Sequence, residues 1–382
     1  MLTCKHAKFT LNPNVTYLNC AYMSPMLKSV EKAGIRGIRT KRNPFSITAD
    51  NFFLESEILR KEFAITINTP ESSRIVIIPS VSYGLANVAA NMSLTKGQEI
   101  VVAAEQFPSN VYPWQSLCSA AGTTLRSVAP PDSLERRGYR WNERILESIN
   151  EKTAAVAIAH FHWADGTRFD LEAIRQRTRE VNALLIIDGT QSVGAFPFDV
   201  SKIQPDALIC AGYKWLMGPY SIGLAYYGPA FDNGKPIEEN WINRLKSEDF
   251  TRLVNYQDNY QEGALRYEVG EHSNFILVPM MLNALKQINR WKPEFIQEYC
   301  KAITADSISR LVEKGYFIED ENWRGSHLFG IRIPQNTDMN LIRQKLIDKK
   351  IFVSVRGNAI RVSPNVYNRK EDMEKFAKVL AS

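Results

Sequence analysis

The sequence predicts an α/β protein whose main sheet is mostly parallel. Short apolar segments recur through the middle of the chain, and turn residues bound each of them; such segments are typical of strands buried on both faces. Helix-length segments of mixed polar and apolar character lie between most of them, as in parallel sheets covered by helices. A length of 382 residues is too great for one small core and favours two domains.

We expect about seven strands, all of them between residues 70 and 230. The apolar segments are 74–79 (RIVIIP), 99–103 (EIVVA), 125–128 (LRSV), 154–160 (AAVAIAH), 184–188 (LLIID), 207–211 (ALICA) and 222–227 (IGLAYY). The clearest helical segments between them are 82–94, 114–121 and 170–182. Together these segments predict a large α/β domain that spans residues 22–262.

The C-terminal part has a different pattern, which predicts a smaller α+β domain. Residues 275–291 favour a long helix with Pro279 in its first turn. Three strand-like segments then alternate with two helical ones: the former are 328–333, 351–355 and 359–363, and the latter are 340–349 and 369–380. We expect this domain to span residues 263–382, with residues 1–21 returning to pack against it.

Composition and charge narrow the class of protein. The net charge of +6 is mild and the basic residues are scattered, which argues against nucleic-acid binding. No apolar stretch is long enough to span a membrane, and the first residues lack the apolar core of a signal peptide. The cysteines are odd in number and far apart, with no C-x-x-C pair, which argues against disulfides and a zinc site. We therefore expect a cytoplasmic, metal-free protein that binds neither nucleic acid nor membrane.

An aspartate and a lysine follow two of the expected strands. Asp188 ends the strand in LLIIDGTQSVG, and Lys214 follows the next strand in AGYKWLMG. Ligands of parallel α/β sheets bind beyond the carboxyl ends of the strands. A lysine there can hold pyridoxal 5'-phosphate (PLP) as a Schiff base, while a carboxylate keeps the ring nitrogen protonated. On spacing alone, a surface aspartate and a surface lysine remain the alternative interpretation.

Several separate segments resemble the class V aminotransferase family of fold-type I PLP enzymes. That group includes cysteine desulfurases, kynureninases and isopenicillin N epimerase-like proteins. The resemblance runs from 17–24 (YLNCAYMS) to 361–368 (RVSPNVYN), with the segments in the family's order. It implies the PLP-dependent transferase fold of the aspartate aminotransferase type, with a seven-stranded sheet. It also implies an enzyme with PLP as cofactor and with Lys214 and Asp188 as catalytic residues.

The resemblance assigns residues to the phosphate of PLP. Residues 79–84 (PSVSYG) match the family's phosphate-binding turn, which implies contacts from Ser80, Val81 and Ser82 at a helix N-terminus. Val81 can contribute only through its backbone, and both serines would otherwise be simple helix caps. Tyr213 resembles the kynureninase tyrosine whose hydroxyl reaches the phosphate, with a packing role as the alternative.

Other segments are expected to surround the PLP ring and the substrate. Phe107, in EQFPSNVYPWQ, matches the residue stacked on the ring, although ordinary core packing is an alternative. Gln191 matches the residue that hydrogen-bonds the phenolic oxygen. Desulfurases carry an asparagine where Trp163 stands, so the roles of His162 and Trp163 stay open. Trp163 and Tyr22 are assigned to the substrate pocket, which makes an apolar or aromatic substrate side chain plausible.

Residues 266–274 (RYEVGEHSN) resemble a segment that reaches the partner subunit's active site and touches its phosphate. The segment has one residue more than the desulfurase pattern, so either His272 or Ser273 is the expected contact. The resemblance therefore implies a homodimer with shared active sites.

Arg361 matches the arginine that binds a substrate α-carboxylate, a pairing suited to a guanidinium fork. Desulfurases carry a nucleophilic cysteine on a loop just before this arginine, and residues 352–361 (FVSVRGNAIR) contain none. We therefore expect a PLP enzyme acting on the amino group or Cα of a small amino-acid-like substrate, as class V aminotransferases or isopenicillin N epimerase-like proteins do. The alternatives are a carbon–sulfur or carbon–carbon lyase of the kynureninase type, and a non-catalytic PLP-binding protein.

Overall fold

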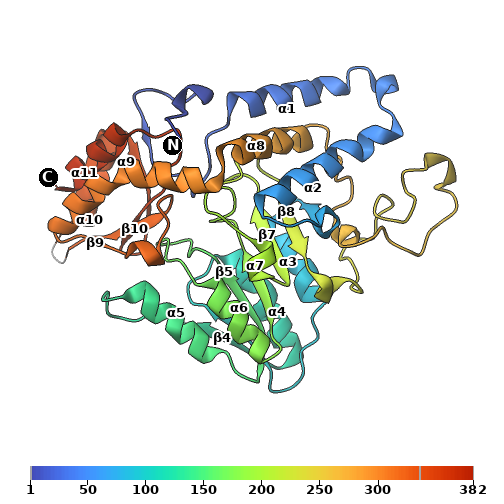
Figure 1. Cartoon of the computed structure of the whole chain (residues 1–382), viewed down its shortest axis with the longest axis horizontal. Helices are drawn as coiled ribbons and strands as arrows, with labels where there is room; N and C mark the ends of the chain where they lie inside the picture. Colours follow the sequence, from blue (N-terminus) through green and yellow to red (C-terminus); the bar gives the residue numbers. More distant parts are fainter. Residues whose placement is uncertain (1, 335–336, 382) are drawn as a thin grey trace.

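A twisted seven-stranded sheet forms the centre of the molecule in a computed structural model that describes residues 2–334 and 337–381 (Figure 1). Its strand order is β2-β8-β7-β6-β5-β3-β4. All neighbours pair in parallel except β8, which is antiparallel to both β2 and β7. The strands are β2 (Ile75–Ile78), β3 (Glu99–Ala103), β4 (Thr124–Val128), β5 (Thr153–Ala159), β6 (Leu184–Asp188), β7 (Ala207–Ala211) and β8 (Gly223–Tyr227). The predicted fold class is confirmed.

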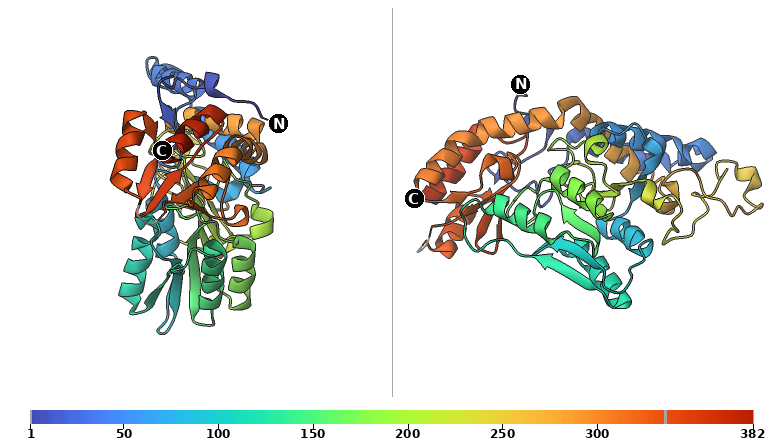
Figure 2. Two further views of the ribbon diagram at one scale, coloured as in Figure 1. Left: turned by 90° about the vertical axis from the view of Figure 1, so that its left-hand side faces the viewer. Right: turned by 60° about the horizontal axis from the view of Figure 1, so that its bottom comes forward.

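Alternate residues of these strands enter different cores, because successive side chains of a strand point to opposite faces. In β2, Ile75 and Ile77 belong to one core, whereas Val76 and Ile78 belong to the other. One face is covered by α3 (Val81–Ala90) and α4 (Tyr112–Ala121). The other face is covered by α1 (Lys28–Thr40), α2 (Leu54–Thr66), α5 (Arg137–Ser148), α6 (Leu171–Glu180), α7 (Val200–Ile203) and α8 (Leu277–Trp291). Figure 2 shows helices on both sides of the strands.

A second, four-stranded sheet of order β12-β13-β10-β9 lies toward the end of the molecule where the C-terminus is marked (Figure 1). Its strands are antiparallel: β9 (Phe317–Ile318), β10 (Phe329–Arg332), β12 (Ser354–Arg356) and β13 (Ala359–Val362). The accompanying helices are α9 (Pro293–Glu313), α10 (Met339–Asp348) and α11 (Lys370–Ala381). Near the N-terminus, β1 (Thr16–Tyr17) pairs in parallel with β11 (Ile351–Phe352). Because α8 packs against α1 and α2, the boundary between residues 262 and 263 stays a prediction.

The described residues contain no helix that is long and apolar enough to cross a membrane. Within the same part of the chain, no group of three or more histidine, cysteine, aspartate or glutamate side chains could hold a metal ion. All five cysteines are free thiols, and Cys4 alone among them is exposed.

A buried carboxylate ties α2 to the sheet and to the segment at residues 266–274. Both oxygens of Glu268 lie 2.9 Å from Nη1 of Arg60, and Oε1 accepts a hydrogen bond of 2.8 Å from the backbone N–H of Ile77. Nε2 of His272 lies 3.3 Å from the same carboxylate, and Nδ1 is 3.0 Å from Oγ of Ser56. All four polar side chains are buried. The buried negative charge of Glu268 is therefore stabilised by the positive charge of Arg60 and by the hydrogen bonds around it.

Replacing Arg60 with alanine should leave the Glu268 charge buried without its cation. We expect Arg60→Ala to lower the free energy of unfolding by about 3–5 kcal/mol. Urea unfolding followed by circular dichroism measures the change, and Arg343→Ala on the exposed side of α10 is the matched control. A loss no larger than that of the control would contradict the assigned role.

Candidate active site

A cavity of about 320 Å³ opens at the carboxyl ends of β5, β6 and β7. It brings together nine of the residues predicted to form the site, although they are spread over more than a hundred positions of the chain. These are Ser80, Val81, Ser82, Phe107, Trp163, Asp188, Gln191, Tyr213 and Lys214. The sequence-based expectation of one pocket at this sheet edge therefore agrees with the geometry.

Lys214 is buried in this cavity with no hydrogen bond or ion pair from its ammonium to any described residue. Its Nζ lies 5.4 Å from the ring centroid of Phe107 and 5.5 Å from that of Tyr213. Burial lowers the pKa of the ammonium from its ordinary value to about 8, against the opposing influence of the Asp188 charge. A lysine in this state is partly neutral near neutral pH, as a nucleophile must be.

Asp188 is the last residue of β6, so the strand itself positions its carboxylate at the cavity. Oδ1 accepts a 3.0 Å hydrogen bond from the backbone N–H of Thr190, and burial raises the pKa of the carboxyl group. The second oxygen receives no hydrogen bond from another described backbone group, so a ligand N–H can approach it. Thr190 was not singled out from the sequence; its position two residues after a strand-end aspartate is the usual signal of such a turn.

The N-terminus of α3 presents free backbone donors to the cavity. Ser80 is the N-cap, and its Oγ accepts a 3.1 Å hydrogen bond from the N–H of Tyr83. The N–H groups of Val81 and Ser82 belong to the first turn, where no intrahelical acceptor exists, and such donors favour anions. Oγ of Ser82 donates to Oγ of Ser109 at 3.0 Å, and Ser109 also lines the cavity. Ser109 was not singled out in the EQFPSNVYPWQ segment.

Phe107 and Trp163 form one wall of the cavity. Their ring centroids lie 5.5 Å apart at an interplanar angle of 80°, and Nε1 of Trp163 donates to the carbonyl of Glu105 at 2.7 Å. Phe107 is 40% exposed, which argues against the alternative of ordinary core packing. Its assignment to the face of the PLP ring stays a prediction.

His162, whose role was left open, supports the loop around the cavity. Its Nε2 lies 3.2 Å from the carbonyl of Ala104 and 3.1 Å from that of Glu105. Its Nδ1 is 3.4 Å from the carboxylate of Asp165, and its ring packs 4.9 Å from that of Trp141. With both ring nitrogens directed at protein atoms, the imidazole holds the segment that carries Trp163.

Gln191 and Tyr213 keep polar atoms available to a ligand. The amide nitrogen of Gln191 donates to the carbonyl of Ala21 at 3.2 Å, and its oxygen accepts from Nε1 of Trp215 at 2.9 Å. An amide NH₂ has two hydrogens, so one remains for a further acceptor. The ring of Tyr213 lies 4.7 Å from that of Tyr220, and its hydroxyl has no hydrogen bond within the described residues.

Arg361 is a buried cation that no described carboxylate neutralises. Its Nη1 donates to the carbonyl of Trp163 at 2.5 Å, and its Nη2 donates to Oγ of Ser354 at 3.2 Å. Its Nε has no partner, and burial lowers the pKa of the guanidinium to about 10. Such an arrangement is costly unless an anionic ligand completes it. The side chain also influences Lys214 electrostatically.

Four predicted site residues are not among those that line the cavity: Arg361, described above, and three others. Tyr22 is exposed and does not line it, so its place in the substrate pocket stays a prediction. His272 points into its own subunit, where Ser56 and Glu268 engage both ring nitrogens. Ser273 is half-buried beside it and remains available to a second subunit. His272 is thus already engaged within its own chain, and the choice between His272 and Ser273 for the expected partner contact stays a prediction.

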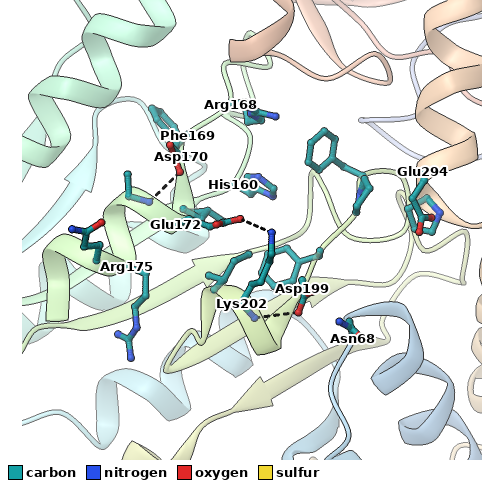
Figure 3. A pocket seen from close by; sticks show the side chains of 18 of the residues that line it. Asn68, His160, Arg168, Phe169, Asp170, Glu172, Arg175, Asp199, Lys202 and Glu294 are labelled. Atoms are coloured by element: carbon teal, nitrogen blue, oxygen red, sulfur yellow. Dashed lines mark hydrogen bonds and ion pairs between the residues drawn. The ribbon is translucent and has the colours of Figure 1, made fainter.

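A much larger cleft of about 1610 Å³ lies beside α6 and α7 (Figure 3). Some of its polar groups engage one another: Nζ of Lys202 lies 3.7 Å from Glu172, and Asp199 accepts a hydrogen bond from the N–H of Lys202. Neither Asp188 nor Lys214 lines it. Size alone therefore does not identify the reaction site, and the smaller cavity has the reactive side chains.

Comparison with known proteins places the chain in a family. Residues 45–376 match the model of the family described as Aminotransferase class-V, and the chain belongs to this family. It is 27% identical over 320 residues to the uncharacterized aminotransferase YcbU of Bacillus subtilis, an alignment that covers 84% of this chain and 81% of the relative.

Two solved structures have the same fold. The cysteine desulfurase CsdA of Escherichia coli has a TM-score of 0.80 at 18% identity, over 98% of this chain and 96% of that one. A mutant of C-DES with glycine covalently linked to its PLP cofactor has a TM-score of 0.84 at 19% identity, over 100% of both chains. At these identities the two likenesses concern the fold alone.

Family membership confirms the predicted class, a PLP-dependent enzyme of the class V aminotransferase group. The residues of the cavity fit this cofactor. An unpartnered buried amine, a carboxylate with an available oxygen and two free backbone N–H groups at a helix N-terminus lie around one cavity. The amine suits the aldehyde of PLP, the carboxylate suits its pyridinium nitrogen, and the N–H groups suit its phosphate.

The Lys214 amine should form the covalent link to PLP. We expect Lys214→Ala to abolish the visible absorbance band that borohydride removes from the wild-type protein. Because only the neutral amine is nucleophilic, attachment of PLP to the apoprotein should accelerate with rising pH and level off above about 8, not above 10.5. Stopped-flow absorbance measures this rate. A borohydride-sensitive band in Lys214→Ala would refute the assignment.

Proposed function

We propose that this chain transfers the amino group of a small amino acid, or moves its Cα proton, at the cavity around Lys214. The observation that carries the proposal is the buried, unpartnered Lys214 amine in one cavity with strand-end Asp188 and the α3 N-terminus. A lysine without a partner in a buried cavity would be hard to explain as a purely structural residue.

Each side chain has a distinct part in this proposal. PLP, when bound, supplies an electron sink for the negative charge that develops at Cα. Asp188 holds a proton on the ring nitrogen, and Lys214, with a pKa of about 8, takes the Cα proton through Nζ. Arg361 binds the α-carboxylate with its unused guanidinium hydrogens. The remaining contacts to the cofactor come from Ser80, Val81, Ser82, Phe107, Gln191 and Tyr213.

Transamination is the first candidate among the possible outcomes. The curated relative YcbU, which aligns over 84% of the chain, is named an aminotransferase. Persulfide chemistry is disfavoured because residues 354–362 form a tight hairpin without a cysteine. Cys20 is the cysteine that acts electrostatically on Lys214, and burial raises the pKa of its thiol to about 12. A thiol in that state is a poor nucleophile.

A screen of amino acids against the PLP-loaded protein tests this function. We expect at least one amino acid to convert the absorbance band to that of the pyridoxamine form, because transamination leaves the amino group on the cofactor. Epimerisation or elimination would restore the starting band. Epimerisation yields the enantiomer, which chiral chromatography detects, and elimination yields an α-keto acid with free ammonia, which an ammonia assay detects. Asp188→Asn should keep the bound cofactor and lose turnover by orders of magnitude. The proposal fails if no amino acid changes the band or is consumed.

We further propose a homodimer in which residues 266–274 reach the active site of the partner subunit. Support comes from the surface around Ser273, where a groove of about 650 Å³ is lined mainly by apolar residues. These include Ile38, Phe52, Trp241, Phe275 and Ile276. Residues 250–256, on the segment that projects from the body in Figure 1, add exposed apolar side chains. Contiguous apolar surface of this kind marks interfaces, and a twofold dimer would bury the same patch of both copies.

Placing a charge in this groove should separate the subunits. Ile38, on α1, is 60% exposed in the single chain, and Ile347, on α10, is 68% exposed far from the groove. We expect Ile38→Asp to shift the sedimentation coefficient toward that of a monomer and to reduce activity, while Ile347→Asp changes neither. A fully active monomeric wild-type protein would rule out the shared site.

A further inference from the structure

The hairpin of β12 and β13 directs two arginines to the same side of the small sheet. Ser354 pairs with Arg361 across the hairpin, and Arg356 pairs with Ala359. Residues two apart on a strand, and residues directly opposite on its neighbour, share a face. Arg356 and Arg361 therefore share one face with Ser354, which itself holds Arg361. The turn is tight because Gly357 adopts a left-handed conformation with φ of 56°.

Trp163 contacts both guanidinium groups. Its carbonyl accepts the hydrogen bond from Arg361, and its ring lies under Arg356, with 5.4 Å between Cζ and the ring centroid. Arg356 donates one hydrogen bond of 3.0 Å, to the carbonyl of its neighbour Val355. Its Nε is buried without a partner, and no described carboxylate lies within ion-pair distance of it. Arg356 is thus a second unpaired cation beside Trp163.

Three of the charged groups around Arg356 pair with one another, whereas Glu105 and Asp132 are exposed and form no ion pair with it within the described residues. It lines a cavity of about 530 Å³ together with Arg137, Arg332 and the carboxylates of Glu105, Asp132 and Asp165. Arg137 and Arg332 each lie 2.9 Å from Asp165, so these two arginines have a counter-ion. Trp163 and His162 line both this cavity and the one that contains Lys214. A substrate side chain that passes Trp163 would therefore leave the first cavity and meet Arg356.

We propose that Arg356 binds a second carboxylate, so that the substrate is an acidic amino acid whose α-carboxylate Arg361 binds. This inference rests on the proposed function and specifies its substrate class. A guanidinium is the preferred protein partner of a carboxylate, and the flat face of Trp163 keeps Arg356 in place without neutralising it. The aromatic residues Phe107, Trp163 and Tyr22 led us to expect an apolar substrate side chain. The proposal instead specifies a negatively charged side chain, because the Trp163 ring holds the Arg356 guanidinium. The charge of Arg356 also reaches Lys214, whose pKa it helps to lower.

Binding of acids that lack an amino group tests the proposal without any covalent step. Calorimetry on the PLP-loaded protein measures the affinity for two pairs of acids of equal chain length. Glutarate is compared with valerate, and succinate is compared with butyrate. In the wild-type protein, the preferred dicarboxylate should bind at least about tenfold more tightly than the monocarboxylate of equal length. Arg356→Gln should remove this preference and leave monocarboxylate binding within about twofold. Arg356→Lys should restore part of the preference, since it keeps the charge but not the fork.

Two controls separate the possible explanations. Arg343→Gln removes the same charge from an exposed site on α10 and should preserve the dicarboxylate preference. Arg361→Gln should weaken mono- and dicarboxylates alike. Equal binding of mono- and dicarboxylates by the wild-type protein, or an unchanged preference in Arg356→Gln, would overturn the proposal.

The failure of the proposed function would have a different signature. A protein that never acquires a borohydride-sensitive cofactor band, or consumes no amino acid, contradicts the function whatever its affinity for acids. A protein that turns over amino acids but shows no dicarboxylate preference contradicts the role of Arg356 alone.

Discussion

The burial of Lys214 at the carboxyl edge of the central sheet is the constraint on which the rest of the site depends. An ammonium removed from water loses hydration, and here no described side chain replaces it with a hydrogen bond. The fold tolerates this because Asp188 ends the neighbouring strand and offsets part of the charge. Because β6 and β7 are parallel neighbours, Asp188 and Lys214 lie at the same edge of the sheet. The strand order thus brings the carboxylate and the amine close together.

Positive charge exceeds negative charge around this edge. Arg361 and Arg356 both lower the pKa of Lys214, and Arg356 also lowers the pKa of Arg361, whereas Asp188 is the carboxylate that acts on Lys214 in the opposite direction. The free N–H groups of the α3 N-terminus add partial positive charge. The protein alone is therefore electrostatically incomplete here, and a phosphate-bearing cofactor with a carboxylate-bearing substrate supplies the missing negative charge.

The strands of the large sheet could be predicted to within about a residue or two because they are short, nearly continuous apolar segments. The direction of β8 was not predicted, although the short connection over residues 212–222 is too brief for the helical crossover that parallel strands need. Helix α9 was not predicted, because its buried stripe includes Cys300, Thr304 and Ser307 and so lacks a continuous apolar pattern.

Within the site, the motifs single out strand-end and turn residues that the structure brings to one cavity, since local backbone geometry positions them. Contacts between distant segments were harder to predict. His272 and Ser273 could not be distinguished by alignment, because the segment has one extra residue. The structure adds that His272 contacts Glu268, four residues earlier, within its own chain. The unpaired state of Arg356 likewise depends on which arginines Asp165 engages, and these come from α5 and β10.

The pairing of β1 with β11 has a consequence for the order in which the molecule forms. Thr16 meets Ile351, and Asn19 accepts a hydrogen bond from Ser354, the residue that holds Arg361. Contacts between such distant positions form late, since a long loop must close first. During synthesis, β5, β6 and β7 can pair long before β11–β13 leave the ribosome. The cavity around Lys214 can therefore take shape before the hairpin that carries Arg361 exists, so the proposed cofactor-binding residues come together before the proposed substrate-binding ones.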